Sequence, residues 1–375
     1  MDVLGTILAF LAVLVILVLV HELGHFAVAK WTGITVQEFG VGFPPRIGSV
    51  VWRGTRYSLN AIPLGGFVKM LGEDGDVEAE KMRQRGLSDA AIDKAMAGAF
   101  NRKPIWVRML VLLAGVGMNF LLAGILFSVA LSLPIQQGRG PLTVTEVQAG
   151  SPAVAADLRV GDIIVSADGQ TFAVSRDLTA YVRSHAGRVV ALTVIRAGEE
   201  VVLEVTPRTL TPADEARGLG AVGFTYDPEE LVEVPASTAG PVTALAAGFG
   251  ATWDLAIQIP GGLADAVAGL IGLSPDAGSA VGPIGIAEET GRVLGAPLVS
   301  QLIFVGILSV NLAVLNVLPF PPLDGGRILV TLIEAIRRRR LPAEREALIY
   351  LTGFTVLIVL VVLISIRDVA NLIGG

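Results

Sequence analysis

A long apolar run that ends in a histidine motif constrains the fold of this chain more than any other feature. The 18 residues from Val3 to Val20 carry no charged side chain, and His21, Glu22 and His25 follow at once as an H-E-x-x-H pattern. An apolar helix of about 20 residues can cross the roughly 30 Å hydrocarbon core of a bilayer. The pattern therefore predicts a membrane helix with strongly polar side chains at one end.

The spacing of this motif favours a metal site. Residues four apart lie about 40° apart around a helix, so His21 and His25 can present two imidazoles to one ion, with Glu22 beside them as a candidate general base. Imidazole pairs suit zinc, and a carboxylate next to a zinc-bound water can take its proton as the water attacks a carbonyl, which implies peptide-bond hydrolysis. The alternative is a polar helix end with two interfacial histidines. Two of the chain's three histidines lie here, which favours the metal.

Composition sets the class of protein and the available ligands. The chain has 375 residues, of which 53% are hydrophobic, which predicts an integral membrane protein. It has no cysteine, so any zinc must be held by His, Asp or Glu side chains. The net charge of -6 gives no sign of a nucleic-acid partner. Asp2 stands where a signal peptide would carry basic residues, so we expect the first helix to be retained.

Hydropathy and basic residues predict a polytopic α-helical membrane protein with four transmembrane helices. The predicted spans lie in residues 1–30, 105–133, 298–335 and 347–367. Basic residues gather in 31–104 and at Arg337 to Arg340, so both loops are expected in the cytoplasm and both termini outside. The apolar stretch Val242 to Ile259 is interpreted as an amphipathic helix on the outer surface, closed by Pro260, rather than as a fifth span.

A second motif supplies a third candidate ligand. The run from Asn316 to Gly326 contains three prolines and two glycines and cannot continue a regular helix. Broken backbone at membrane depth is tolerated only inside protein or beside a wet cavity, so Asp324 is expected to face an interior site. Asp324 would complete a His-His-carboxylate set for zinc with His21 and His25. The alternative is an Asp that caps a helix at the interface.

Two extramembrane regions separate the spans. Residues 31–104 predict a cytoplasmic-side β hairpin. The edge of this hairpin could accept an unwound substrate strand, and the alternative is an ordinary loop hairpin without that role. Residues 78–99 predict a solvated helical insertion, to which we assign no chemistry. Residues 140–208 alternate as a small α/β domain that resembles a PDZ domain in its GSPA and GD-I-I elements. PDZ domains bind an extended peptide or a chain terminus. Residues 209–280 are expected to be linker and outer-surface amphipathic helices.

These motifs, in this order, resemble the site-2 protease family, in particular its bacterial RseP-like branch. The resemblance rests on HELGH at His21, NVLPFPPLDGG at Asn316 and the PDZ-like segment between them. It implies an intramembrane zinc metalloprotease in which His21, His25 and Asp324 bind Zn2+, Glu22 is the catalytic base and Asn316 contacts the substrate backbone. It also implies a bacterial cytoplasmic (inner) membrane as the location, and single-span membrane protein substrates within that lipid bilayer, such as anti-sigma factors or remnant signal peptides.

The second predicted helix carries a further match with one departure. Gly115-Val-Gly-Met-Asn119 resembles a motif of that family, which usually has proline where Gly117 stands. Asn119 is a candidate for substrate or oxyanion binding, or alternatively for an interhelical hydrogen bond. Two other functions fit parts of the sequence: a membrane-anchored metalloprotease acting on soluble or misfolded proteins, and a non-catalytic PDZ scaffold. The position of both polar motifs beside apolar spans disfavours each of them.

Overall fold

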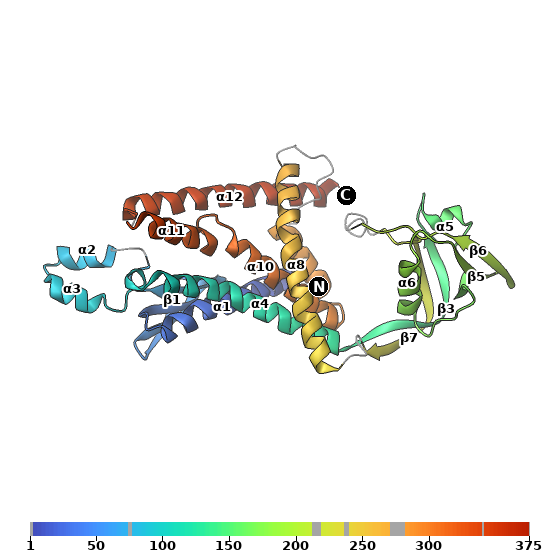
Figure 1. Cartoon of the computed structure of the whole chain (residues 1–375), viewed down its shortest axis with the longest axis horizontal. Coiled ribbons are helices and arrows are strands. Elements are labelled where there is room, and N and C mark those ends of the chain that lie inside the picture. The colour runs from blue at the N-terminus through green and yellow to red at the C-terminus, as the bar shows by residue number, and fades with distance from the viewer. Residues whose placement is uncertain are drawn as a thin grey trace. The chain divides into compact units, whose positions relative to one another are not determined.

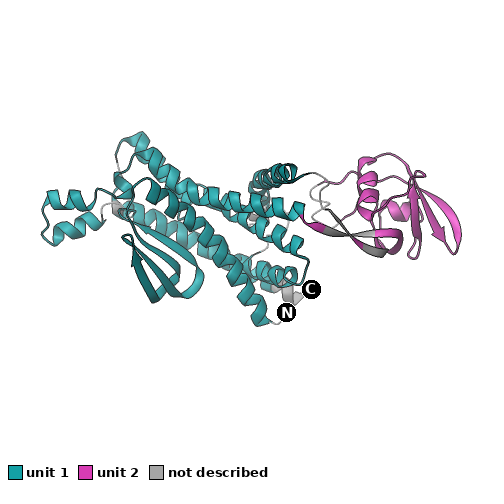
Figure 2. Cartoon of the chain, turned by 90° about the horizontal axis from the view of Figure 1, so that it is seen from below, with its two compact units in different colours: residues 1–132, 239–375 teal, residues 133–238 magenta. Residues whose placement is uncertain are grey.

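The chain forms two compact units in a computed structural model that describes residues 3–73, 77–211, 219–235, 240–270, 282–339 and 341–374. Unit 1 comprises Met1–Ser132 and Ala239–Gly375, and unit 2 comprises Leu133–Thr238 (Figure 2). Parts of the predicted linker (212–218, 236–239 and 271–280) and Arg340 of the predicted basic cluster lie outside the described residues.

Unit 1 is mostly helical. Its longer helices are α1 (Val3–Trp31), α4 (Ile105–Ser132), α8 (Pro241–Leu270), α9 (Pro283–Val293), α10 (Leu298–Val317), α11 (Asp324–Arg337) and α12 (Ala343–Gly374) (Figure 1). Within the described residues, five helices are long and apolar enough to cross a membrane: α1, α4, α8, α10 and α12. Four of them coincide with the predicted spans, and α8 is the fifth, so length and composition do not confirm a count of four.

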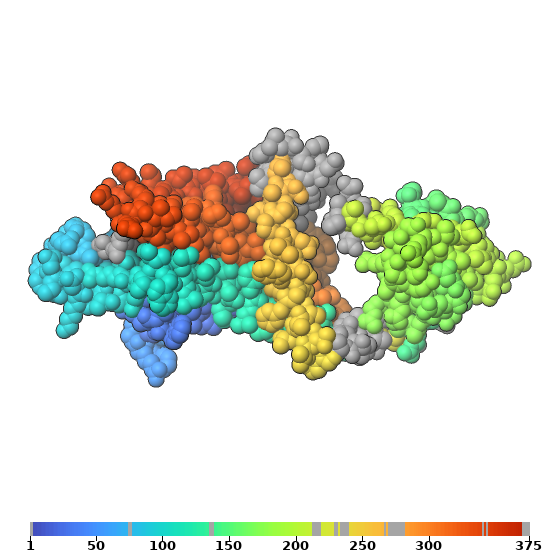
Figure 3. Space-filling view, in the orientation of Figure 1, coloured from blue at the N-terminus to red at the C-terminus, as the bar shows by residue number. Residues whose placement is uncertain are grey.

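The helix end predicted at Pro260 is wrong, because α8 continues through this residue to Leu270. A proline removes one intrahelical hydrogen bond, but the turn just before it is anchored by packing. Leu255, Ala256 and Ile259 pack against an apolar cluster formed by α4 and α10. Figures 1 and 3 show α8 running across α4 and α12 rather than along them.

Contacts between helices establish their relative directions. The Nδ1 atom of His25 lies 2.8 Å from the carbonyl oxygen of Val111, whereas His21 lies beside Asn119, so α1 and α4 are antiparallel. α10 is antiparallel to α4 as well, because Gly306 lies against Phe127, whereas Ser309, further along α10, donates to the carbonyl of Asn119, earlier in α4. α1 and α10 therefore run in the same direction. The segment between α4 and α10, which includes α8, consequently begins and ends at the same end of the bundle.

The start of α1 and the end of α12 lie at that same end. The Asp368 carboxylate of α12 accepts hydrogen bonds of 3.1 Å from the backbone N–H groups of Gly282 and Gly285, at the start of α9. Further along α9, Gly291 packs against Thr6 of α1. α9 therefore contacts both the start of α1 and the end of α12.

Strands β1 (Val36–Trp52) and β2 (Thr55–Met70) form the expected hairpin. Arg53 and Gly54, both at positive φ, make the two-residue turn that suits the twist of a hairpin. Both strands bend, so segment 36–41 pairs with 56–59 on one side and with 66–70 on the other. Segment 66–70 is thus an edge of the sheet, and no strand covers its outer side in the part of the chain that the structure describes.

The insertion after β2 is a small helical unit. It contains α2 (Val77–Gln84), α3 (Asp89–Ala95) and the short η1 (Phe100–Arg102). Its apolar core is formed by Leu71, Ala79, Ile92, Met96 and Ala99. The charged side chains of α2 and α3 are largely exposed, as expected for a solvated insertion.

Unit 2 is larger than the predicted 140–208 domain. It contains β3 (Pro134–Val147), α5 (Pro152–Ala155), β4 (Ile163–Ala167), α6 (Ser175–Ser184), β5 (Val190–Arg196), β6 (Glu199–Val205) and β7 (Phe224–Pro235). The sheet order is β6-β5-β4-β3-β7. The expected boundary is wrong because β7, placed in the linker by the sequence, pairs along the length of β3, from Val147 with Phe224 to Pro134 with Pro235.

Candidate metal centre and catalytic cavity

Three predicted ligands converge inside unit 1. Asp324 Oδ2 lies 2.8 Å from His21 Nε2 and 3.1 Å from His25 Nε2, and the two Nε2 atoms are 3.1 Å apart. Both histidines are buried. Residues 21 and 324 come together because α1 and α10 run in the same direction and α11 begins at Asp324, directly after the break that follows α10.

The donor set fits zinc. Ligands about 2.0–2.1 Å from a tetrahedral ion lie roughly 3.3 Å from one another, close to the observed separations, and two imidazoles with one carboxylate form a known zinc ligand set. Asp324 reaches the site as the first residue of α11, after the proline-rich break. The next residues are Gly325 and Gly326, where an added Cβ would collide with the backbone of that break. The glycines therefore allow α11 to start close to the end of α10.

Helix α4 forms the wall behind both imidazoles. His25 Nδ1 donates to the Val111 carbonyl, and the Asn119 side chain lies 3.4 Å from His21 Nδ1. A Cβ on Gly115 would lie 2.5 Å from His25 Nε2 and 2.8 Å from His21 Cε1, so only glycine permits this close approach. At Gly117, where the resembled motif has proline, an added Cβ meets nothing within 4 Å, and α4 continues without interruption.

A cavity of about 580 Å³ opens beside the three ligands. Glu22 and Asn316 both line it, which brings the candidate base and the candidate substrate contact to the same space. Asn119 is fully buried and is not among the lining residues, and its side chain instead contacts His21. The geometry therefore gives Asn119 the interhelical contact that the sequence left open.

The hairpin forms another wall of this cavity. Residues of the edge segment line it, namely Gly66, Phe67, Val68 and Met70. Gly65 and Gly66 lie against Val18 and Leu19 of α1, which holds the edge next to the helix that carries the histidines.

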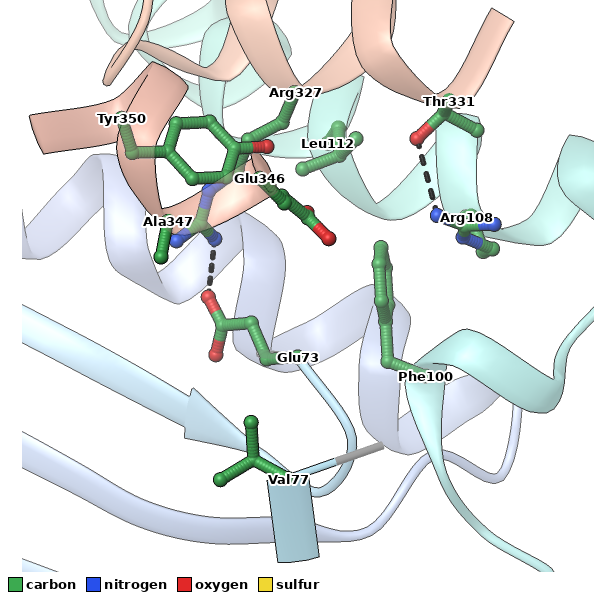
Figure 4. A pocket seen from close by; sticks show the side chains of 10 residues that line it. All are labelled: Glu73, Val77, Phe100, Arg108, Leu112, Arg327, Thr331, Glu346, Ala347 and Tyr350. Atoms are coloured by element: carbon green, nitrogen blue, oxygen red, sulfur yellow. Dashed lines mark hydrogen bonds and ion pairs between the residues drawn. The ribbon is translucent and has the colours of Figure 1, made fainter. Parts of the chain in front are cut away.

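Sequence reasoning missed a charged pair between this cavity and a second one. Glu73 and Arg327 line both cavities and form an ion pair, drawn in Figure 4. The other Glu73 oxygen accepts from the backbone N–H of Met70, so the pair connects the end of β2 to α11. The second cavity, of about 180 Å³, also contains Tyr350 of α12. The sequence signal for this pair was the position of Arg327, directly after the Asp-Gly-Gly run and next to apolar residues.

Comparison with known proteins agrees with this site. The sequence profile described as Peptidase family M50 matches residues 9–360. The chain is 33% identical to a provisionally named zinc metalloprotease of Agrobacterium fabrum, over 99% of this chain and 97% of that relative. It is 28% identical to zinc metalloprotease RasP of Geobacillus kaustophilus, over 98% of both chains.

One solved structure matches a smaller part. The PDZ domain of an SdrC-like protein from Listeria innocua is 24% identical, with 24% of this chain and 98% of that chain covered, at a TM-score of 0.21. The extent of the profile match and of the first relative is sufficient for the classification: the chain belongs to peptidase family M50, the site-2 type of zinc metalloprotease.

Proposed function

We propose that this intramembrane zinc metalloprotease holds its ion with His21, His25 and Asp324, and that Glu22 is its general base. The observation that carries the proposal is the convergence of three ligand atoms on a cavity that Glu22 also lines. A bound zinc ion would polarise a substrate carbonyl and lower the pKa of a coordinated water.

The residues of the chain have distinct tasks in this reaction. Glu22 contributes no ligand atom to the cluster, so its carboxylate is free to accept the proton of the attacking water and to deliver it to the leaving amine. Asn316 lines the cavity, and its amide can both donate to and accept from the backbone of an unwound substrate.

The test compares the wild type with Glu22→Gln on single-span substrates in liposomes. Glu22→Gln is expected to retain zinc, because it removes no ligand, and to lose cleavage by a factor of at least about 100. His21→Ala is the control that should lose both zinc and cleavage. Cleavage by Glu22→Gln at the wild-type rate would refute the role of Glu22, whereas a wild type without zinc would refute the metal site.

We further propose four membrane crossings, with α8 lying along the outer surface. An odd number of crossings between α4 and α10 would make these two helices parallel, whereas their contacts are antiparallel. Four crossings put the basic loops in the cytoplasm and unit 2 with both termini outside. Because the chain has no cysteine, single cysteines at exposed Thr171 and Gln84 can report sidedness. An impermeant maleimide added to intact cells should label only Thr171→Cys, and labelling of Gln84→Cys would contradict this orientation.

The edge segment 66–70 is the proposed binding site for the unwound substrate strand. It borders the catalytic cavity and leaves one side without a strand partner among the described residues, so a substrate can add to the sheet through main-chain hydrogen bonds. Disulfide crosslinking tests this, with Phe67→Cys paired against a substrate cysteine moved one residue at a time. Crosslinks at every second position indicate a paired strand. A repeat of three to four positions indicates a bound helix and would reject the proposal.

Unit 2 offers a groove for an extended peptide or chain terminus, as in a PDZ domain. A cavity of about 110 Å³ lies between α6 and residues 220–226, and its apolar lining includes Leu178, Val182 and Phe224. Thr179→Trp, on the exposed side of α6, is expected to block peptide binding measured by fluorescence anisotropy. Thr171→Trp, which is exposed outside this cavity, is the matched control. Equal binding by both variants would exclude the groove.

A further inference from the structure

Helix α4 supplies a partner for the Nδ1 atom of each candidate zinc-binding histidine. His25 Nδ1 lies 2.8 Å from the Val111 carbonyl, which can only accept, so the proton is on Nδ1 and Nε2 has its lone pair free for the metal. His21 has an amide partner instead of a carbonyl, because Asn119 lies 3.4 Å from its Nδ1. The two histidines are therefore held by different kinds of group.

The Asn119 side chain has one unused polar atom. Its Nδ2 is the atom near His21, while its Oδ1 is buried and has no hydrogen-bond partner among the described residues. The residue itself is well anchored, since its backbone carbonyl accepts a 2.9 Å hydrogen bond from Ser309 of α10. A half-turn of the amide exchanges the oxygen and the nitrogen without moving the backbone.

The two amide orientations correspond to two tautomers of His21. With Nδ2 facing the ring, Nδ1 accepts and the proton is on Nε2, where it is donated to Asp324 Oδ2 at 2.8 Å. That tautomer cannot bind a metal through Nε2. With Oδ1 facing the ring, Nδ1–H donates to the amide oxygen, and the Nε2 lone pair is free. An amide can partner both tautomers, which an aliphatic side chain cannot do.

We propose that Asn119 is a positioning residue that selects the metal-binding tautomer of His21 by turning its amide oxygen to Nδ1–H. This inference rests on the proposed role of His21 as a zinc ligand. It gives Asn119 a role at the metal rather than at the substrate, in line with its absence from the cavity lining. Partners of this kind typically change metal affinity 10- to 100-fold.

The experiment measures Zn2+ affinity of the purified full-length protein by competition with a chelator, for wild type, Asn119→Leu and Asn119→Asp. Leu is nearly isosteric but cannot accept, so Asn119→Leu is expected to bind Zn2+ about 10- to 100-fold more weakly. Asp can only accept, so Asn119→Asp is expected to retain wild-type affinity. The visible absorption of the Co2+-loaded forms provides a second readout, with Asn119→Asp resembling the wild type and Asn119→Leu altered.

Three outcomes would overturn the inference or its basis. Wild-type Zn2+ affinity in Asn119→Leu, with a raised KM, would assign Asn119 to the substrate. Equal weakening in Asn119→Leu and Asn119→Asp, with unchanged melting of the metal-free proteins, would show that an acceptor is not what His21 requires. Absence of Zn2+ binding by the wild type would instead refute the proposed metal site itself.

Discussion

The most direct test of the metal centre is a substitution of Gly115 that fills the space this glycine leaves for the two imidazoles. A Cβ there would lie 2.5 Å from His25 Nε2, 2.7 Å from His25 Cε1 and 2.8 Å from His21 Cε1. Ordinary carbon contacts begin at about 3.4 Å, so both rings would have to move by about 0.6 to 0.9 Å. Neither ring can do this freely, because His25 is fixed to Val111 and His21 to Asn119 on the same helix.

A shift of that size matters because zinc–ligand distances tolerate only about 0.2 Å. Gly115→Ala is therefore expected to weaken Zn2+ binding at least about 100-fold, equivalent to about 2.8 kcal/mol, and to abolish cleavage. The matched control is Gly117→Ala, which places the same methyl group on the same helix where nothing lies within 4 Å. It is expected to keep both zinc and activity.

The assay is chelator competition for Zn2+ together with cleavage of a single-span substrate in liposomes. Melting of the metal-free proteins separates loss of the site from loss of the fold. Wild-type Zn2+ affinity in Gly115→Ala would refute the reasoning, since the histidines would then not bind metal in the position where the structure has them. Equal losses in Gly115→Ala and Gly117→Ala would point to a general effect on α4.

Three further predictions concern regions away from the metal. We expect kcat to fall in Arg327→Met and in Glu73→Gln. Because the two side chains form one ion pair, the fold-loss of kcat in the double variant should be smaller than the product of the two single fold-losses. A double variant whose fold-loss equals that product would refute the coupling. Asp368→Ala should lower the melting temperature of the full protein, with about 1 kcal/mol lost, because the start of α9 loses its capping carboxylate; unchanged melting would contradict this. The hydrogen bonds from Arg196 hold the pKa of Asp162 below its usual range, so this pair stabilises unit 2 above about pH 4 and the contribution fades as the pH falls below that value. The difference in urea stability between wild type and Asp162→Asn should accordingly disappear toward low pH, and a constant difference would exclude the linkage.

Local pattern alone was sufficient for the first helix, the break before Asp324, the hairpin and the class of chemistry. The apolar run before His21, the break that ends at Asp324 and the alternation of the hairpin are properties of short segments, and helix and strand periods express them directly. The chemical identity of the ligands also follows from residue type, because a chain without cysteine can bind zinc only through His and carboxylate groups.

Contacts between distant segments decided the rest. The pairing of β7 with β3 enlarged unit 2, and packing before Pro260 carried α8 past a residue that normally ends a helix. The Val111 carbonyl that orients His25 is a backbone group and has no signature in the sequence. The role of Asn119 was left open for the same reason: an asparagine in a membrane helix is compatible with several partners, and only the antiparallel packing of α1 on α4 put it beside His21.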